Sequence, residues 1–443
     1  MTAIELLALL NQQGVVLSVD GANLRISAPS GSLTDDIRAK LQAHKAELID
    51  LLADSATGSG VVDLRDYAGP LPREAVPLSF AQERLWFIDE LEPGNTQYNL
   101  PSAVSLAGEL DVEALRRALD ALALRHECLR TVFARAGREP RARVLTTMSC
   151  PLVMHDAAGW PADELRAALT RLCNEPFSLG SGPLLRIHLL RQEPSRHLLL
   201  LIVHHIISDG VSLGRLLQEL ADLYRQALDG NLSTAAATTP QYADFAAWQR
   251  ATLRAAELER LQRYWRDQLA GAPLRLDLPT DYPRPAAPSY RGDWCHEQLP
   301  AATLAALRSL ARAHDATLYT LLLTAFAALL FRYSRQADLL IGSPVAGRQL
   351  SATETMQGLF VNSVVIRAQI EPSTRFADLL GQVTRTTLDA LSHQSLPFEK
   401  LVEMLAPDRE PAMAPVFQVL FNMQNREAEL PEFAGLTAAP VVV

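Results

Sequence analysis

The stretch HLLLLIVHHIISDGVSL, from His197 to Leu213, constrains the fold of this chain more than any other. Its aliphatic residues follow one another without polar alternation, which is typical of a strand in a sheet that helices cover on both faces. The residues after Gly210 have the apolar spacing of a helix. A strand that runs into a helix favours an α/β fold, with His204 and His205 at the end of the strand.

Two adjacent histidines raise the question of a metal site, and their spacing argues against one. Successive side chains of a strand point to opposite faces, so His204 and His205 are expected to face different sides. No further residues with a known metal-ligand spacing lie nearby. We therefore expect no bound metal. Each histidine is either a reactive group or a buried structural group bonded to the backbone.

Asp209 and Gly210 connect the strand to the helix. An aspartate just before a helix caps the helix or pairs with a buried arginine more often than it reacts. Gly210 suits a tight turn, in which a backbone N–H can approach a substrate carbonyl.

From Pro77 onward, amphipathic helices alternate with β-branched strands. Expected helices span 112–126, 162–175, 213–230, 303–314 and 317–331, and expected strands span 197–205, 337–344, 360–370 and 417–425. Residues 278–292 are rich in proline and cannot form a continuous helix. We expect this segment to open the second of two halves, 77–277 and 278–443.

Residues 1–53 form a separate unit in this interpretation. The pattern predicts a helix, a hairpin around Asp20 and Gly21, and a second helix. Residues 54–76 are rich in Gly, Ser and Pro and are predicted to be a linker.

Composition narrows the possible partners and the cellular location. A formal net charge of -9 argues against a nucleic-acid-binding protein and against binding to an anionic membrane. The four cysteines lie far apart, which is typical of reduced thiols. The N-terminus lacks the features of a signal peptide, and the apolar run 317–331 is too short for a membrane span. We expect a cytoplasmic protein in which that run is a buried helix.

The pattern His-His-x-x-x-Asp-Gly resembles the signature of nonribosomal peptide synthetase condensation domains, and more distantly of chloramphenicol-acetyltransferase-like acyltransferases. Further motifs of the family follow in the expected order. They are LSFAQERLWFIDELEPGNTQYNLP from Leu78, RHECLRTVF from Arg125, YADFAAWQR from Tyr242, IGSPVAGRQLSATETMQGLFVNSVVIR from Ile341, HQSLPFEKLVE from His393 and PVFQVLFNMQN from Pro415.

This resemblance implies two chloramphenicol-acetyltransferase-like lobes in a V-shaped pseudodimer, with a tunnel between them. It makes His205 the catalytic residue, supported by His204 and Gly210. Asp209 would then be mainly structural, with Arg130 as its expected partner. Arg348 and Asn362 match a motif at the interface of the lobes. Val211 and Ser343 are expected to line the tunnel.

The implied reaction is amide formation. The α-amine of an acceptor aminoacyl-thioester attacks a donor thioester, and phosphopantetheine arms of an upstream and a downstream carrier protein deliver both substrates. The chain itself is expected to bind no cofactor. His205 either removes a proton or orients the amine.

Three positions depart from the family pattern. Val211 replaces a bulky aromatic residue, and Ser178 and Ser395 replace acidic residues. The overall pattern is most similar to the subtype that joins L-configured donors to L-configured acceptors, and both histidines argue against cyclisation. No adenylation or carrier motif is present, so we expect a piece of a larger synthetase.

Residues 1–53 resemble the TubC-like docking domains that open some synthetase chains. Arg25, Lys40 and Lys45 are expected to bind the acidic C-terminal tail of an upstream subunit, unless these charges are merely solvated.

Two other functions remain open at this point. One is an acyltransferase that uses a free acceptor amine, and the docking unit argues against it. The other is a catalytically silent module that only recruits carrier proteins, and the intact histidine motif argues against that one.

Overall fold

The computed structural model describes residues 16–20, 23–27, 35–48, 64, 72–137, 139–148, 151–233, 240–285, 292–405, 413–424 and 430–442. The chain divides into two compact units, and neither is a single stretch of sequence. One unit contains 1–61, 254–351 and 362–423, and the other contains 62–253, 352–361 and 424–443. The boundaries expected at 53, 76 and 277 remain predictions.

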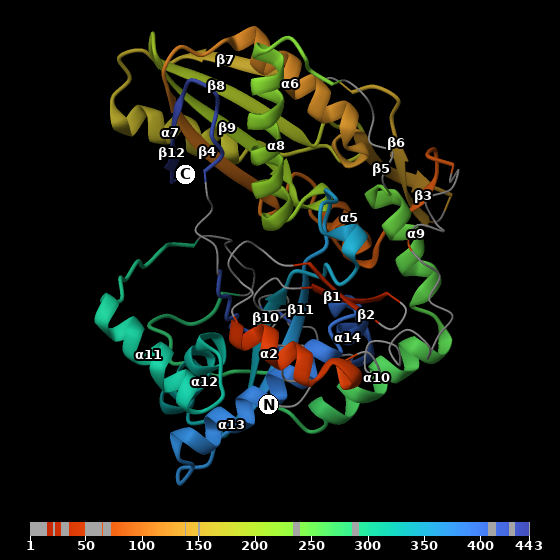
Figure 1. The fold of residues 1–443 in the computed structure, drawn as a ribbon, viewed down its shortest axis with the longest axis vertical. Helices are drawn as coiled ribbons and strands as arrows, with labels where there is room; N and C mark the ends of the chain where they lie inside the picture. The colour runs from red at the N-terminus through yellow and green to blue at the C-terminus, as the bar shows by residue number, and fades with distance from the viewer. Residues whose placement is uncertain are drawn as a thin grey trace. The chain divides into compact units, whose positions relative to one another are not determined.

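A five-stranded sheet forms the centre of the second unit, in the order β12-β4-β9-β8-β7 (Figure 1). Only β7 and β8 pair in parallel; the other neighbours are antiparallel. The strands are β4 (Asn99–Ala107), β7 (Leu152–Asp156), β8 (Leu185–Glu193), β9 (Arg196–His204) and β12 (Thr437–Val441). The last strand, β12, comes from the C-terminal end of the chain and completes the sheet along β4.

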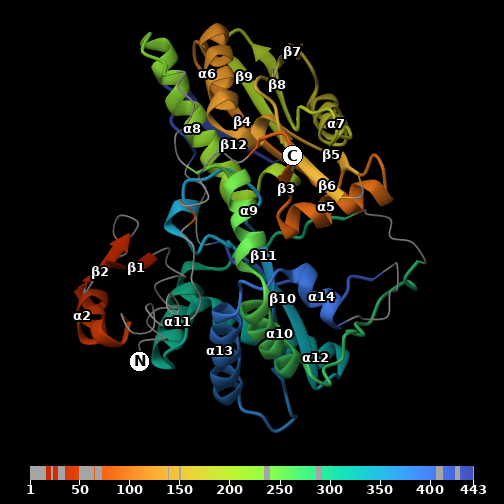
Figure 2. The ribbon, with the colours of Figure 1, turned by 90° about the vertical axis from the view of Figure 1, so that its right-hand side faces the viewer.

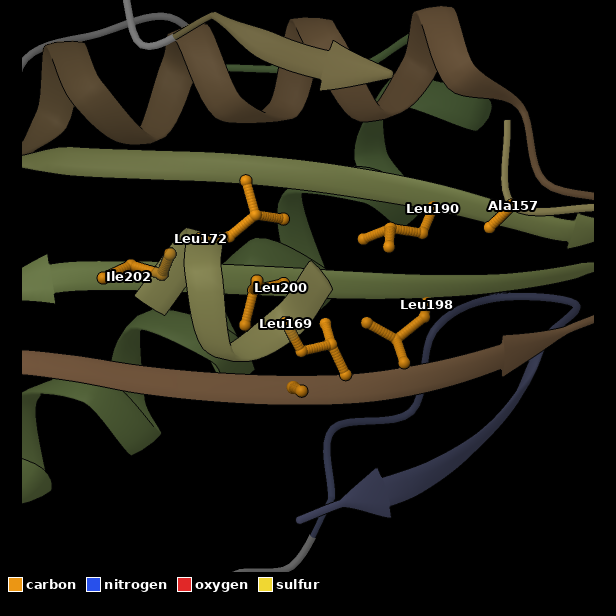
Figure 3. Packing of buried hydrophobic residues seen from close by; sticks show 8 residues of the cluster. Ala157, Leu169, Leu172, Leu190, Leu198, Leu200 and Ile202 are labelled. Carbon is orange, nitrogen blue, oxygen red and sulfur yellow. The ribbon is translucent and has the colours of Figure 1, made fainter. Parts of the chain in front are cut away.

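Strand β9 carries the aliphatic run and is buried along almost its whole length. Leu198, Leu200 and Ile202 point to one face, where Leu169 and Leu172 of helix α7 (Ala162–Cys173) pack against them (Figure 3). Helices α6 (Val112–Arg125) and α8 (Gly210–Leu228) cover the other face (Figure 2). Coverage on both faces explains why β9 lacks polar alternation.

Smaller elements complete this unit. They are helices α5 (Phe80–Leu91) and α9 (Tyr242–Thr252) and a three-stranded sheet in the order β3-β6-β5. Its strands are β3 (Val76–Pro77), β5 (Thr131–Ala136) and β6 (Glu139–Val144), and the short helix η1 spans Glu127–Arg130. Arg73 forms a two-bonded ion pair with Asp244, at 2.8 and 3.0 Å. Arg73, which lies in the segment predicted to be a linker, thus contacts α9 of this unit.

The other unit pairs strand β10 (Asp338–Val345) antiparallel with β11 (Asn362–Gln369). Its helices are α10 (Ala255–Leu269), α11 (Ala301–Ala313), α12 (Leu318–Ser334), α13 (Phe376–Ser392) and α14 (Phe398–Leu405). The apolar helix α12 buries Leu321, Leu323 and Leu330, as expected. Among the described helices, none alone is long and apolar enough to cross a membrane, although α11 and α12 pass that test as a bent pair by length and composition.

The strand expected at 417–425 is wrong for the part that the structure describes. Leu420 forms only an isolated bridge with Gly342. Val416 has a left-handed backbone with φ of 70°, which interrupts an extended run just before this segment. The side chain of Gln418 also bonds backbone groups of Leu274 and Leu276. These bonds fix the segment as an irregular loop.

The expected N-terminal hairpin is confirmed. Strand β1 (Val16–Asp20) pairs antiparallel with β2 (Asn23–Ser27), and Asp20 lies opposite Asn23. Helix α2 (Asp35–Ala43) is the second predicted helix, whereas the first one lies outside the described residues.

Candidate functional site

The two histidines occupy different kinds of backbone. His204 is the last residue of β9, and His205 begins a short 3-10 turn, η2 (His205–Ile207). Their side chains differ in exposure: His204 is 3% exposed, and His205 is half-buried. The two rings therefore lie in different environments, and a turn rather than strand alternation separates them. That the two side chains face opposite sides stays a prediction.

His204 is held as a neutral buried ring. Its Nδ1 accepts the backbone N–H of Ile206 at 3.2 Å, so the proton of the ring lies on Nε2. The ring meets Phe177 edge to face at 5.9 Å between centroids. Burial, and then electrostatic interaction with the neighbouring His205 and Arg186, lower the pKa of His204 to about 4. At neutral pH this histidine supports the turn without carrying charge.

The ring of His205 is fixed in one tautomer. Its Nδ1 lies 2.6 Å from the carbonyl oxygen of Ser208, which can only accept, so Nδ1 carries the proton when the ring is neutral. The lone pair is then on Nε2, the atom at the other side of the ring. The turn thus presents a nitrogen that can accept a proton or a hydrogen bond.

Both carboxylate oxygens of Asp209 accept backbone hydrogen bonds. Its Oδ1 accepts the N–H of Ser212 at 2.7 Å and caps α8. Its Oδ2 accepts the N–H groups of Phe360 at 2.9 Å and Val361 at 3.3 Å. The side chain is 2% exposed. The expected capping role is present, and a second role is added, because the carboxylate anchors segment 357–361.

Arg130 does not have the expected part in this arrangement. Its guanidinium group donates to the carbonyls of Leu145 at 2.6 Å and Leu124 at 3.3 Å. The prediction that it pairs with Asp209 is therefore corrected: these bonds tie Arg130 to the last turn of α6 and to the residue that follows β6.

Segment 357–361 is also hydrogen bonded to residues of helices α8 and α9. The Ser212 hydroxyl donates to the Gly358 carbonyl at 2.7 Å and accepts the Gly358 N–H at 3.2 Å. The Tyr242 hydroxyl donates to the Leu359 carbonyl. Gly358 has φ of +156°, and an added Cβ would lie 1.9 Å from the Tyr242 ring. Only glycine fits this position.

Gly210 and Val211 form the first residues of α8. A Cβ at Gly210 would meet no atom within 4 Å, so packing does not require glycine there. Val211 is 42% exposed, although it is apolar. Both positions leave open space at the helix start.

Three predicted site residues belong to the other unit. Asn362 opens β11, and its Nδ2 donates to the carbonyls of Gln394 at 2.8 Å and Leu396 at 2.7 Å. Its Oδ1 accepts the N–H of Phe398 at 3.0 Å, so it holds the loop before α14. Arg348 is half-buried in the segment after β10.

Ser343 is 3% exposed on β10, and its hydroxyl lies 2.6 Å from that of Tyr319. These contacts do not test whether Ser343 lines a tunnel, so that role stays a prediction.

The three cations of the predicted docking surface lie on the hairpin and on the segment after it. Arg25 is in β2, opposite Ser18. Lys40 is in the last turn of α2, and Lys45 is exposed just beyond that helix. Within the described ranges, no group of three or more His, Cys, Asp or Glu side chains is arranged to hold a metal ion.

Comparison with known proteins shows the family. Residues 73–440 match the model of the condensation domain, and residues 4–54 match that of the TubC N-terminal docking domain. The chain belongs to the condensation-domain family of nonribosomal peptide synthetases and has the chloramphenicol-acetyltransferase-like fold of that family. Condensation domains of these synthetases catalyse amide bond formation.

The similar proteins are synthetases and a related domain. The chain is 44% identical to phosphinothricin tripeptide synthetase PhsC of Streptomyces viridochromogenes, over 82% of the chain and 34% of the relative. It is 40% identical to malpibaldin synthetase of Mortierella alpina, over 94% of this chain and 7% of the relative. A solved complex of the X-domain and OxyB from teicoplanin biosynthesis contains a chain of 28% identity and TM-score 0.77, with 85% of this chain and 82% of that chain covered. The chain thus spans about a third or less of the length of these synthetases.

Sequence reasoning missed the residues that brace the turn. Ser212, Tyr242 and Gly358 stand inside or beside family motifs, but their types alone do not reveal what they bond. The sequence feature that pointed to these residues was the order of the family motifs along the chain. In the structure, the hydroxyl groups of Ser212 and Tyr242 bond to segment 357–361, and Gly358 lies within that segment.

Proposed function

We propose that this chain joins two carrier-bound substrates by a peptide bond, with His205 acting on the attacking amine. The amine nitrogen forms a bond to the donor carbonyl carbon, the carbon–sulfur bond breaks, and the nitrogen loses a proton. The bond from His205 Nδ1 to the Ser208 carbonyl supports this proposal most directly, because it leaves the lone pair on Nε2.

The basicity of the substrate decides what His205 needs to do. A reference α-amine has a pKa of about 7.7–8.0, so roughly a tenth is already neutral at pH 7. Creating the nucleophile therefore needs little help. Nε2 is useful for orienting the amine and for accepting the proton that appears on nitrogen after attack. The thiol that leaves receives a proton when the reaction is complete.

The test is a His205→Ala variant in a single-turnover assay with two loaded carrier proteins. We expect a rate loss of about 10²–10⁴-fold, the usual value of a general base. The exposed His314 supplies a control, since His314→Ala should retain the rate. Full activity of His205→Ala would overturn the proposal.

Other residues have supporting roles in this proposal. His204 and Asp209 hold the turn, and an N–H at Gly210 faces the reacting carbonyl. Val211 and Ser343 line the path of the phosphopantetheine arms, and Arg348 and Asn362 stabilise the interface between the two lobes of a V-shaped pseudodimer. A Val211→Trp variant tests the path, because a bulky side chain should raise KM for large acceptors more than for small ones.

The proposed partners are an upstream donor carrier protein and a downstream acceptor carrier protein, in the cytoplasm. The preferred substrates are L-configured on both sides. A panel of loaded carriers of either configuration tests this preference. Turnover with free amines but not with loaded acceptor carriers would instead indicate a soluble-acceptor acyltransferase.

The docking domain is proposed to recruit an upstream subunit through the acidic tail of that subunit. Arg25, Lys40 and Lys45 supply positive charge along one sequence segment. Charge reversal at these three positions should weaken tail binding in calorimetry, and the effect should shrink as salt rises. Unchanged affinity would show that these charges do not bind the tail.

A silent recruitment module is the second candidate, because the X-domain structure is a complex with another protein, OxyB. The fixed tautomer of His205 favours catalysis instead. Binding of two loaded carriers without product would favour the silent module.

A further inference from the structure

Gln82 lies in a buried position at the start of α5. It is the third residue of the helix and 3% exposed. It forms a capping box with Ser79: the Ser79 hydroxyl accepts the Gln82 N–H at 3.1 Å, and Gln82 Oε1 accepts the Ser79 N–H at 3.2 Å. This motif uses only the side-chain oxygen of residue 82, so glutamate would serve it equally well.

The amide nitrogen of Gln82 has a separate task. Its Nε2 donates at 3.1 Å to the carbonyl of Ile206, which lies 124 residues further along the chain. The orientation of the amide is fixed, because exchanging the two atoms would place a donor against the Ser79 N–H and an acceptor against the Ile206 carbonyl. A glutamine is therefore needed at this position for the contact with Ile206.

Both backbone polar groups of Ile206, in the middle of the turn, are hydrogen bonded to side chains. Its N–H donates to His204 Nδ1, and its carbonyl accepts from Gln82. The peptide groups on both sides of this residue are thus held. The bond from His205 to the Ser208 carbonyl spans the same turn, so its geometry depends on how these peptide groups lie.

A second set of bonds joins Gln82 to the other side of the turn. The Tyr242 hydroxyl donates to the Leu359 carbonyl, so it must accept from the Ser79 hydroxyl, which lies 2.9 Å away. Leu359 precedes Phe360, whose N–H donates to Asp209. The bonds therefore form a closed ring from Gln82 through segment 357–361 and back to the turn.

We propose that Gln82 is a positioning residue for His205, acting through the Ile206 carbonyl. The inference rests on the proposed role of His205. Removal of the Nε2 donor leaves the Ile206 carbonyl without its partner, and the turn then relaxes. A misplacement of about 1 Å costs about 10²-fold in rate. We expect kcat to fall by roughly 10–100-fold, with KM for both loaded carriers little changed.

Two variants separate this role from helix capping. Gln82→Glu retains the oxygen that the capping box uses but, when ionised, cannot donate to Ile206. Gln82→Met keeps the length of the side chain and removes both bonds. Gln249→Glu is the matched control: Gln249 Oε1 accepts the N–H of Phe80 at 3.1 Å, and glutamate retains that bond. The control should keep the wild-type kcat.

A spectroscopic measurement reports on the ring itself. In the wild-type chain, the ¹⁵N shifts of the neutral His205 ring should show the proton on Nδ1. In both Gln82 variants, we expect a mixture of the two His205 tautomers. The circular dichroism spectrum should match that of the wild-type chain, which shows that the variants still fold. This result does not depend on turnover.

The outcomes distinguish the two proposals. If His205→Ala stays fully active, the role of His205 is wrong whatever Gln82 does. If His205→Ala is inactive but both Gln82 variants keep kcat within about twofold and the wild-type tautomer, the positioning role of Gln82 is wrong. Equal losses of kcat in the Gln249→Glu control would also overturn it.

Discussion

The Oδ2 atom of Asp209 accepts the backbone N–H of Phe360 at 2.9 Å, across 151 residues of sequence. The other oxygen caps α8 through Ser212. One buried carboxylate therefore joins the start of a helix to a segment that arrives much later in the chain. The asparagine substitution separates these two functions.

In Asp209→Asn, one amide oxygen can still cap α8, but the NH₂ group then faces the N–H groups of Phe360 and Val361. We expect a loss of about 2–4 kcal/mol in the free energy of unfolding, since buried donors lose a charged acceptor. Urea denaturation measures this loss. In addition, hydrogen exchange should rise in segment 357–361 more than in α8. Uniform exchange in both places would contradict the assignment.

Alanine substitutions at Gly358 and Gly210 are expected to have opposite effects on stability: the first destabilises the protein and the second does not. Gly358→Ala places a Cβ against the ring of Tyr242 in a backbone region that favours glycine, so we expect a loss of about 3 kcal/mol or more. Gly210→Ala meets open space and should leave thermal stability within about 0.5 kcal/mol. If Gly210→Ala nevertheless lowers kcat, the space at the helix start is used by substrate. A stable Gly358→Ala protein would show that segment 357–361 can move aside.

The buried His204 predicts how stability depends on pH. Its pKa is about 4 in the folded chain, against an ordinary value of 6.5. Between these values the unfolded chain binds a proton that the folded chain excludes, so stability should fall as pH decreases from 6.5 to 4. The complete effect of one such histidine is roughly 3 kcal/mol.

His204→Asn retains an acceptor for the Ile206 N–H and removes the titrating ring. This variant should lose less stability than the wild-type chain when urea denaturation is repeated at pH 7 and pH 4.5. Burial also lowers the pKa of His188 to about 4, so part of the acid sensitivity should remain. Identical pH profiles of variant and wild type would contradict the prediction.

Asn362 allows a similar test in the other unit. Asn362→Asp keeps the acceptor for Phe398 but places a carboxylate oxygen against the carbonyls of Gln394 and Leu396. We expect a loss of roughly 2–4 kcal/mol and faster hydrogen exchange at 394–398. Ser395 in the same loop is exposed, and Ser395→Ala should change stability by less than about 0.5 kcal/mol.

Local patterns predicted the parts of the fold that depend on local forces. The unbroken aliphatic run identified β9, and apolar spacing identified α6, α7 and α8, because burial on a given face imposes a period on the sequence. The hairpin β1–β2 followed from alternation around Asp20. The segment 417–425 has a similar alternation, but bonds from Gln418 to distant backbone groups hold its described part, 417–424, as a loop.

The bracing of the site could not be predicted in the same way. The partners of Asp209 are backbone N–H groups at Phe360 and Val361, and a backbone amide has no residue type that a sequence displays. The same reason explains the error at Arg130, whose partners are backbone carbonyls. The order of the family motifs identified the correct segments, but only the structure shows which atoms form hydrogen bonds.

Strand β12 has a consequence for how the protein is made on the ribosome. It supplies the edge of the sheet along β4, yet it is synthesised after nearly all of the unit that contains β10 and β11. Until then, β4 presents an open edge with unpaired backbone groups, which is a template for pairing with other chains. Expression of 62–253 alone should therefore yield aggregates, and a chaperone or a supplied β12 peptide should be needed to keep the nascent half soluble.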